Sequence, residues 1–167
     1  KLQPQKTIDQ FWQNLKSSIP GRFQLLKTEK STILLDCANS IDAFQNLFLG
    51  IRLLAYKTEI NNIIVIAGSH AKAFDHETFI KDIRYFFKKN SGEIFFCPIN
   101  FKAKTTKSSW SAERLCNIAK NLKIRSTAFD NFKTAFSTAM EQSDDKSLVV
   151  VTGSSEIITE YLNSTKS

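Results

Sequence analysis

The chain has 167 residues, of which 42% are hydrophobic, 11% aromatic and 23% charged, with only five Gly and three Pro. This length fits one domain, and the composition supplies enough apolar side chains for a packed core, which excludes a disordered or low-complexity chain. The 23 basic and 16 acidic residues give a net charge of +7. That charge permits an anionic partner such as a nucleic acid, a nucleotide or a polyglutamate, but requires none.

The predicted elements alternate between amphipathic helices and short apolar strands. The helices carry apolar residues at helical spacing, whereas the strands are nearly continuous apolar runs, typical of strands that are covered on both faces. In chain order they are a helix at 7–18, strands at 22–27 and 32–36, a helix at 42–57, a strand at 63–67, a helix at 76–89, a strand at 93–97, helices at 111–122 and 132–140, a strand at 148–152 and a helix at 156–162.

The alternation predicts β-α-β units with parallel strands. The strands at 22–27 and 32–36 are an exception, because the few polar residues between them are too short for a crossover and indicate an antiparallel pair. We therefore predict an α/β fold with a Rossmann-like sheet. The sheet is mixed but mainly parallel, with about six strands, helices on both faces and an N-terminal antiparallel hairpin.

The sequence shows no targeting segment and no cysteine pattern of a disulfide or zinc site. No apolar run approaches the ~20 residues that span a bilayer, and the first residues contain no apolar signal segment. Cys37, Cys97 and Cys116 include no C-x-x-C pair, which argues against a disulfide framework or zinc site and favours a reducing compartment. We expect a cytoplasmic protein without membrane contact, cut from a longer chain because residue 1 is not Met.

Small polar residues follow four predicted strands, at 36–40, 68–70, 97–98 and 152–155. Ligands in open α/β sheets bind at these carboxyl ends, although ordinary strand-to-helix turns with N-cap residues have the same composition. Neither G-x-x-x-x-G-K-S/T nor G-x-G-x-x-G occurs, so we do not expect the chain alone to bind a triphosphate tightly. The spacing of His70, His76 and their acidic neighbours matches no familiar metal-ligand set, and we expect Cys37 to be a half-buried packing residue.

The order of several short motifs resembles a known family. Pro20-Gly21-Arg22 precedes the hairpin, Leu34-Leu35-Asp36-Cys37-Ala38-Asn39-Ser40-Ile41-Asp42-Ala43 follows it, a later strand ends at Gly68, and Val150-Val151-Thr152-Gly153-Ser154 lies near the end. Over residues 20–162 this is similar to the C-terminal domain of folylpolyglutamate synthase/dihydrofolate synthase in the Mur ligase superfamily. That family reads P-G-R, a hairpin, L-D-G-A-H-N-P-x-A, a strand ending at Gly, and T-G-S.

The chain departs from that pattern at several positions. Cys37, Asn39, Ser40 and Ile41 stand where the family has Gly, His, Asn and Pro, and residues 69–74 replace its Asp-Lys-Asp run. The resemblance implies that residues 20–167 form a Mur ligase-type C-terminal domain. It also implies that residues 1–19 are a linker or helix leading from an upstream domain.

The resemblance further implies an ATP-dependent C–N ligase that is incomplete and inactive without its upstream ATPase domain. That domain of the same chain would hold most of the ATP and Mg²⁺. A carboxylate of folate or dihydropteroate would become an acyl phosphate, and the amine of glutamate would attack it to give an amide, ADP and phosphate. We expect a monomer with small-molecule substrates, and the residues do not decide between dihydrofolate synthase and folylpolyglutamate synthase activity.

Five residues match the family's functional positions. The resemblance implies that Arg22 is catalytic and contacts the ATP phosphates, and a fork-shaped permanent cation suits phosphoryl oxygens. It implies that Asp36 holds the nucleotide, as strand-end carboxylates hold ribose hydroxyls, with weaker contacts from Asn39 and Ser40. Ser154 would contact the incoming glutamate. The alternatives are a surface ion pair for Arg22 and cap or turn roles for the other four.

Two other functions stay open. A peptidoglycan Mur ligase C-terminal domain shares the fold and the ATP chemistry, but T-G-S and the lack of a D-N-P-R-like motif argue against it. A non-catalytic Rossmann-like binding module would use a basic surface with neighbouring aromatics. Its residues are Lys81, Arg84, Lys88, Lys89, Lys102, Lys104 and Lys107, with Phe101 and Trp110. We expect that surface to be a solvated helix face and a loop, and we do not expect nucleic acid as the partner.

Overall fold

The computed structural model of the chain describes residues 20–100 and 108–165. The helix predicted at 7–18 and residues 101–107 lie outside these ranges. The described elements, in chain order, are β1 (Gln24–Lys27), β2 (Thr32–Asp36), α2 (Ile41–Lys57), β3 (Asn62–Ala67), α3 (His76–Phe87), β4 (Gly92–Phe96), α4 (Ala112–Asn121), β5 (Ser126–Ala128), α5 (Phe132–Gln142), β6 (Ser147–Thr152) and α6 (Ser155–Ser164).

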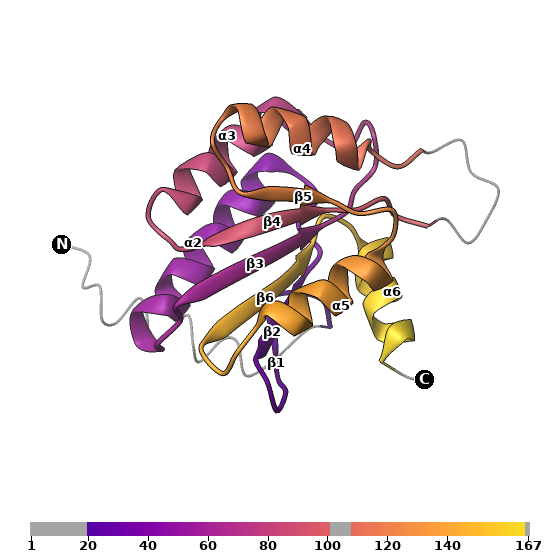
Figure 1. Cartoon of the computed structure of the whole chain (residues 1–167). Helices are drawn as coiled ribbons and strands as arrows, with labels where there is room; N and C mark the ends of the chain where they lie inside the picture. Colours follow the sequence, from indigo (N-terminus) through magenta and orange to yellow (C-terminus); the bar gives the residue numbers. More distant parts are fainter. Residues whose placement is uncertain (1–19, 101–107, 166–167) are drawn as a thin grey trace.

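The strands form one sheet in the order β1-β2-β6-β3-β4-β5 (Figure 1). β1 pairs with β2 in antiparallel fashion, and all other neighbours are parallel. β6 comes last in the chain but lies in the middle, where Val150 pairs with Leu34 of β2 and with Val65 of β3.

Helices cover both faces of the sheet because alternate strand residues point to opposite sides (Figure 1). On one face, Leu34, Val65 and Val150 pack with the apolar residues of α2, α3 and α4. On the other, their chain neighbours Leu35 and Val151 pack with α5 and α6. Both faces are buried, which explains why the strand sequences are apolar throughout.

The predicted fold class is confirmed, with its mixed six-stranded sheet, N-terminal antiparallel pair and helices on both faces. Five of the six strands were located in the sequence, and β5 was not. It has three residues and only Ser126 among them is buried, so it shows no apolar run that could have revealed it.

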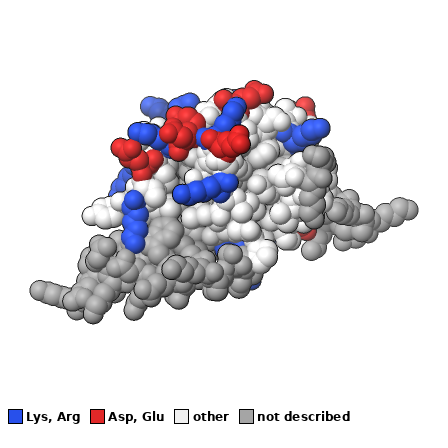
Figure 2. Space-filling model, turned by 90° about the horizontal axis from the view of Figure 1, so that it is seen from below, with Lys and Arg blue, Asp and Glu red and all other residues white. Residues whose placement is uncertain are grey.

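Acidic and basic side chains are mixed on the surface seen from below. Lys and Arg residues lie among Asp and Glu residues along the upper rim of that view, where the described residues are seen (Figure 2). In the part of the chain that the structure describes, no helix is both long and apolar enough to cross a membrane.

Candidate functional site

A polar hollow of about 600 Å³ opens at the carboxyl edge of the sheet. The connections that leave β2 and β3 run to the face covered by α2 and α3, whereas β6 continues into α6 on the opposite face. The segment that follows β6 and the segments that follow its neighbours β2 and β3 thus lie on opposite faces of the sheet. This divergence opens a crevice of the kind that binds ligands in open α/β sheets. The residues that line it are Asn39, His70, Lys72, Ala73, Ser108, Ser154, Ser155 and Glu156.

Two glycines bring the ends of β3 and β6 close together. Gly153 has a φ of +115°, and a Cβ atom there would lie 2.4 Å from the carbonyl oxygen of Gly68. The amide of Gly68 donates to the carbonyl oxygen of Thr152 over 3.1 Å. Both the backbone conformation and the close approach require glycine at position 153, so the T-G-S motif has a local structural cause.

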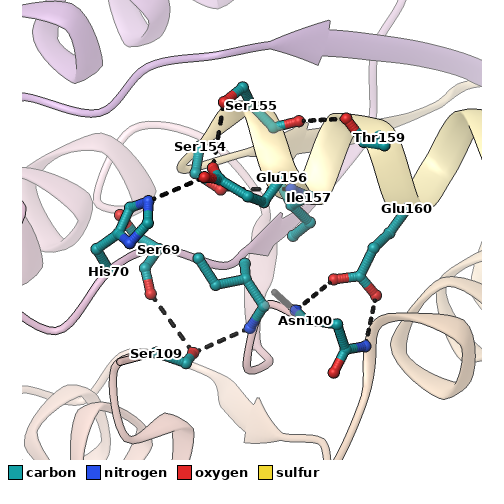
Figure 3. A network of polar contacts seen from close by, with 11 residues as sticks. Ser69, His70, Asn100, Ser109, Ser154, Ser155, Glu156, Ile157, Thr159 and Glu160 are labelled. Atoms are coloured by element: carbon teal, nitrogen blue, oxygen red, sulfur yellow. Dashed lines mark hydrogen bonds and ion pairs between the residues drawn. The ribbon is translucent and has the colours of Figure 1, made fainter. Parts of the chain in front are cut away.

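A network of polar contacts ties the loop after β3 to α6. Figure 3 shows the His70 ring and the Glu156 carboxylate pointing toward one another, and Nε2 and Oε1 are 3.2 Å apart. The Ser155 hydroxyl donates to the other Glu156 oxygen over 3.2 Å. Burial works to raise the pKa of Glu156, but hydrogen bonds and the His70 charge outweigh it, and the pKa lies below its ordinary value.

The same network fastens the loop after β4. The Glu160 carboxylate of α6 accepts from the backbone amide of Asn100 over 2.9 Å and from its side-chain amide over 3.1 Å (Figure 3). The Ser109 hydroxyl accepts from the amide of Ile99 over 2.9 Å. The loops at this edge are therefore held to α6 and to each other by side chains.

Asp36 links the turn before the hairpin to the end of β2. Its Oδ2 accepts from the amide of Phe23 and its Oδ1 from the amide of Ala38, each over 2.9 Å. Burial raises the pKa of Asp36, and these two amides and the charge of Arg22 only partly oppose that effect. Arg22 itself is exposed beside this carboxylate.

Cys37 has the packing role that its sequence position predicts. It is half-buried, its amide donates to the carbonyl oxygen of Gly21 over 2.7 Å, and a Cβ atom on Gly21 would lie 2.9 Å from its sulfur. Burial and the neighbouring Asp36 raise the pKa of the Cys37 thiol, which keeps it protonated and poorly nucleophilic at neutral pH.

Two of the predicted site residues are N-caps. The Ser40 hydroxyl accepts from the amide of Ala43 and the buried Ser154 hydroxyl from the amide of Ile157, each over 3.3 Å. Asn39 is exposed and lines the same hollow as Ser154. The structure thus brings Asn39 and Ser154 together at the hollow and places Arg22 and Asp36 at the neighbouring strand end.

Some site features escaped the sequence analysis, and one expectation was wrong. His70 and Glu156 were not paired, although each follows a strand-end glycine within three residues. Trp110 does not belong to an exposed aromatic surface, because it is only 3% exposed and its Nε1 donates to the carbonyl oxygen of Cys97 over 2.8 Å. Within residues 20–100 and 108–165, no group of three or more His, Cys, Asp and Glu could hold a metal ion.

These features, a mixed sheet with a polar crevice beside its last strand, fit the family that the chain belongs to. The model of the family described as Mur ligase, glutamate ligase domain, matches residues 21–155, so the chain is a member of this family of ligase domains. A comparison with curated protein sequences found no match.

Solved structures of folylpolyglutamate synthases share the fold. The bifunctional folylpolyglutamate synthase/dihydrofolate synthase from Yersinia pestis CO92 matches with a TM-score of 0.69 at 19% identity, over 90% of this chain and 32% of its own. FolC of E. coli in complex with ADP matches with a TM-score of 0.70 at 18% identity, over 89% and 32%. The Thermotoga maritima folylpolyglutamate synthase matches with a TM-score of 0.58 at 16% identity, over 92% and 33%. The chain spans about a third of the length of these structures.

Proposed function

We propose that the chain is the C-terminal domain of an ATP-dependent ligase that joins glutamate to a carboxylate of folate or dihydropteroate. The observation that carries this proposal is the polar hollow at the carboxyl edge, next to Arg22 and Asp36, inside the region that matches the glutamate ligase domain. The nucleotide-bound structures of the relatives support it, since one contains ADP and another contains AMPPNP, Mn and L-glutamate. In this proposal the complete protein is a cytoplasmic monomer.

The residues at the end of β2 fit a nucleotide. A carboxylate has about four acceptor positions, and Asp36 uses two of them for backbone amides. The remaining lone pairs suit ribose hydroxyls. Arg22 is exposed, so its guanidinium is open to phosphate oxygens. We expect Mg²⁺ to be held by the upstream ATPase domain.

When bound, ATP would supply the phosphoryl group that activates the substrate carboxylate. Arg22 would neutralise negative charge that develops during transfer, in the way that preorganised donors stabilise transition states. Lys72 and Asn39, which are exposed at the hollow, would donate to the glutamate carboxylates, with Ser154 beside them. The loops fastened to α6 would hold these donors in place.

The test is an activity assay of the complete ligase encoded by the full gene. We expect phosphate release with ATP, glutamate and either dihydropteroate or folate. Release only with a UDP-muramoyl acceptor would overturn the folate proposal in favour of a peptidoglycan ligase. The 167-residue chain serves as the control, because we expect it neither to hydrolyse MgATP nor to bind it with a low-micromolar dissociation constant.

A further inference from the structure

A second hollow, of about 400 Å³, lies at the amino edge of the sheet, at the end opposite the candidate site. One wall is the turn from α3 to β4, and the other is the turn from α4 to β5. Its lining combines a basic rim with apolar side chains: Arg84, Lys88, Lys123 and Arg125, together with Phe87, Leu122 and Ile124. Its volume lies in the range of small-molecule sites.

Basic residues outnumber acidic ones in the two segments that build this hollow. Residues 84–93 and 117–127, which build its two walls, contain six basic residues and one acidic residue. The two segments therefore carry a net charge of +5. Of their six basic residues, Arg84, Lys88, Lys123 and Arg125 line the hollow. The basic residues of the first segment lie close together in the sequence, and the fold adds those of the second, some 30 residues further on.

The two walls are held together by bonds that leave the charges at the surface. Arg84 Nε donates to the carbonyl oxygen of Leu122 over 3.2 Å. The amide of Ile94 donates to the carbonyl oxygen of Arg125 over 3.0 Å. The acidic residue, Glu93, pairs with Arg125, whose side chain is still 71% exposed, over 3.3 Å. Lys88 and Lys123 are exposed as well.

Lys123 has a backbone conformation that does not favour lysine. Its φ is +59°, at the position just after the C-cap of α4, Leu122. Glycine or asparagine is the usual residue in this left-handed conformation. Strained residues cluster at functional sites, and here the strain places one more ammonium group at the rim.

We propose that this amino-edge hollow binds a small ligand that carries neighbouring phosphate groups, through Arg84, Lys88, Lys123 and Arg125. Arginine binds phosphate oxygens in a bidentate way, and lysines add point charges. These four side chains line one hollow, an arrangement that suits a short oligophosphate better than a long strand. The site is independent of the proposed ligase function, because it lies at the other end of the sheet.

Calorimetric titration of the 167-residue chain with inorganic tripolyphosphate, without Mg²⁺, tests the proposal. We expect a dissociation constant below about 1 mM in 50 mM NaCl, weakening several-fold in 200 mM NaCl as salt screens the charges. No measurable binding in 50 mM NaCl would overturn the site. Tighter binding of a long single-stranded oligonucleotide, with a steep salt dependence, would replace it by a nucleic-acid surface.

Two variants of Lys123 separate binding from folding. Lys123→Gly should weaken tripolyphosphate binding roughly fivefold while the melting temperature stays level or rises, because glycine relieves the left-handed backbone. Lys123→Glu should weaken it about tenfold or more. The matched control is Lys133→Glu, which makes the same charge change at an exposed position of α5 on the other face. Equal losses in Lys123→Glu and Lys133→Glu would show a diffuse charge effect and overturn the site, as would loss of binding in Arg22→Ala.

Discussion

The two edges of the sheet differ in how their side chains are used. At the carboxyl edge, His70, Asp36, Glu156 and Glu160 bond across loops and hold them together. At the amino edge, the basic side chains of 84–93 and 117–127 extend into solvent, with one acid among them. One edge therefore depends on fixed geometry, and the other on the density of charge. We expect the largest effects of substitution at the first edge.

The largest effect expected at the carboxyl edge is that of Arg22→Ala on turnover of the complete ligase. Losing a charged donor that acts in the transition state lowers the rate roughly 100- to 1,000-fold, or about 2.7–4 kcal/mol. The exposed position of Arg22 predicts a stability change below about 1 kcal/mol. Arg22→Lys should recover only part of the rate, because it lacks the fork. Steady-state kinetics and thermal melts measure both quantities, and unchanged turnover in Arg22→Ala would end its catalytic assignment.

Gly153→Ala should give the largest loss of stability, about 3 kcal/mol. A Cβ atom there meets the backbone of Gly68 at 2.4 Å, and φ is +115°, so neither strand end can accommodate it without moving. Urea denaturation measures the free energy of unfolding. Ser155→Ala, two residues away and exposed, is the control and should change it by no more than about 0.5 kcal/mol. A free energy of unfolding that hardly changes in Gly153→Ala would show that the backbone at Gly153 and Gly68 can move apart to accommodate a Cβ atom.

Asp36→Asn should lower the free energy of unfolding by about 1–3 kcal/mol, since the carboxylate accepts from two backbone amides and an amide group brings a donor against one of them. Asp42→Asn, at an exposed position in the first turn of α2, is the matched control and should have a smaller effect. Equal effects would mean that Asp36 does not link the hairpin turn to β2.

Glu156→Gln should have the smallest effect of this series, at most about 1 kcal/mol near pH 7. Because the folded pKa of Glu156 lies below its ordinary value of 4.5, its charge stabilises the fold above that pH. This contribution is lost as the pH falls through the folded pKa. The melting temperatures of the wild-type chain and of Glu156→Gln, measured from pH 7 to pH 3, should converge at the acid end.

The control for Glu156→Gln is Glu59→Gln. The Glu59 carboxylate forms an ion pair with Lys146 over 2.9 Å, and the Glu59 side chain is 80% exposed. Such an exposed pair contributes little, so we expect a smaller loss than at Glu156. A pH-independent difference between wild type and Glu156→Gln would show that the charge of Glu156 does not stabilise the fold.

Much of the fold could be predicted because burial leaves a strong pattern. β3 and β6 are covered on both faces, so Ile63–Ala67 and Leu148–Thr152 read as apolar runs. β5 left no such pattern, because it is a short edge strand whose Thr127 is exposed. Its position depends on pairing with Ile94, Phe95 and Phe96 of β4, which local sequence does not encode.

The candidate site was predictable to a lesser degree. The strand ends could be read from the sequence, and they place Asn39 and Ser154 at one hollow. The contact between His70 and Glu156 could not be predicted, because it joins residues 86 positions apart through the parallel pairing of β3 and β6. Trp110 was misread because its polar, Lys-rich surroundings hide a burial that arises from packing against Phe96 and Phe79.

The central place of β6 has a consequence for biosynthesis. Residues 147–152 leave the ribosome after all the other strands, yet β2 and β3 pair with them rather than with each other. Until they emerge, the nascent chain carries two apolar strands with open edges, a state that invites association with other chains. A stop codon ahead of Ser147 would leave those two edges unpaired permanently, so we expect the truncated chain to be insoluble.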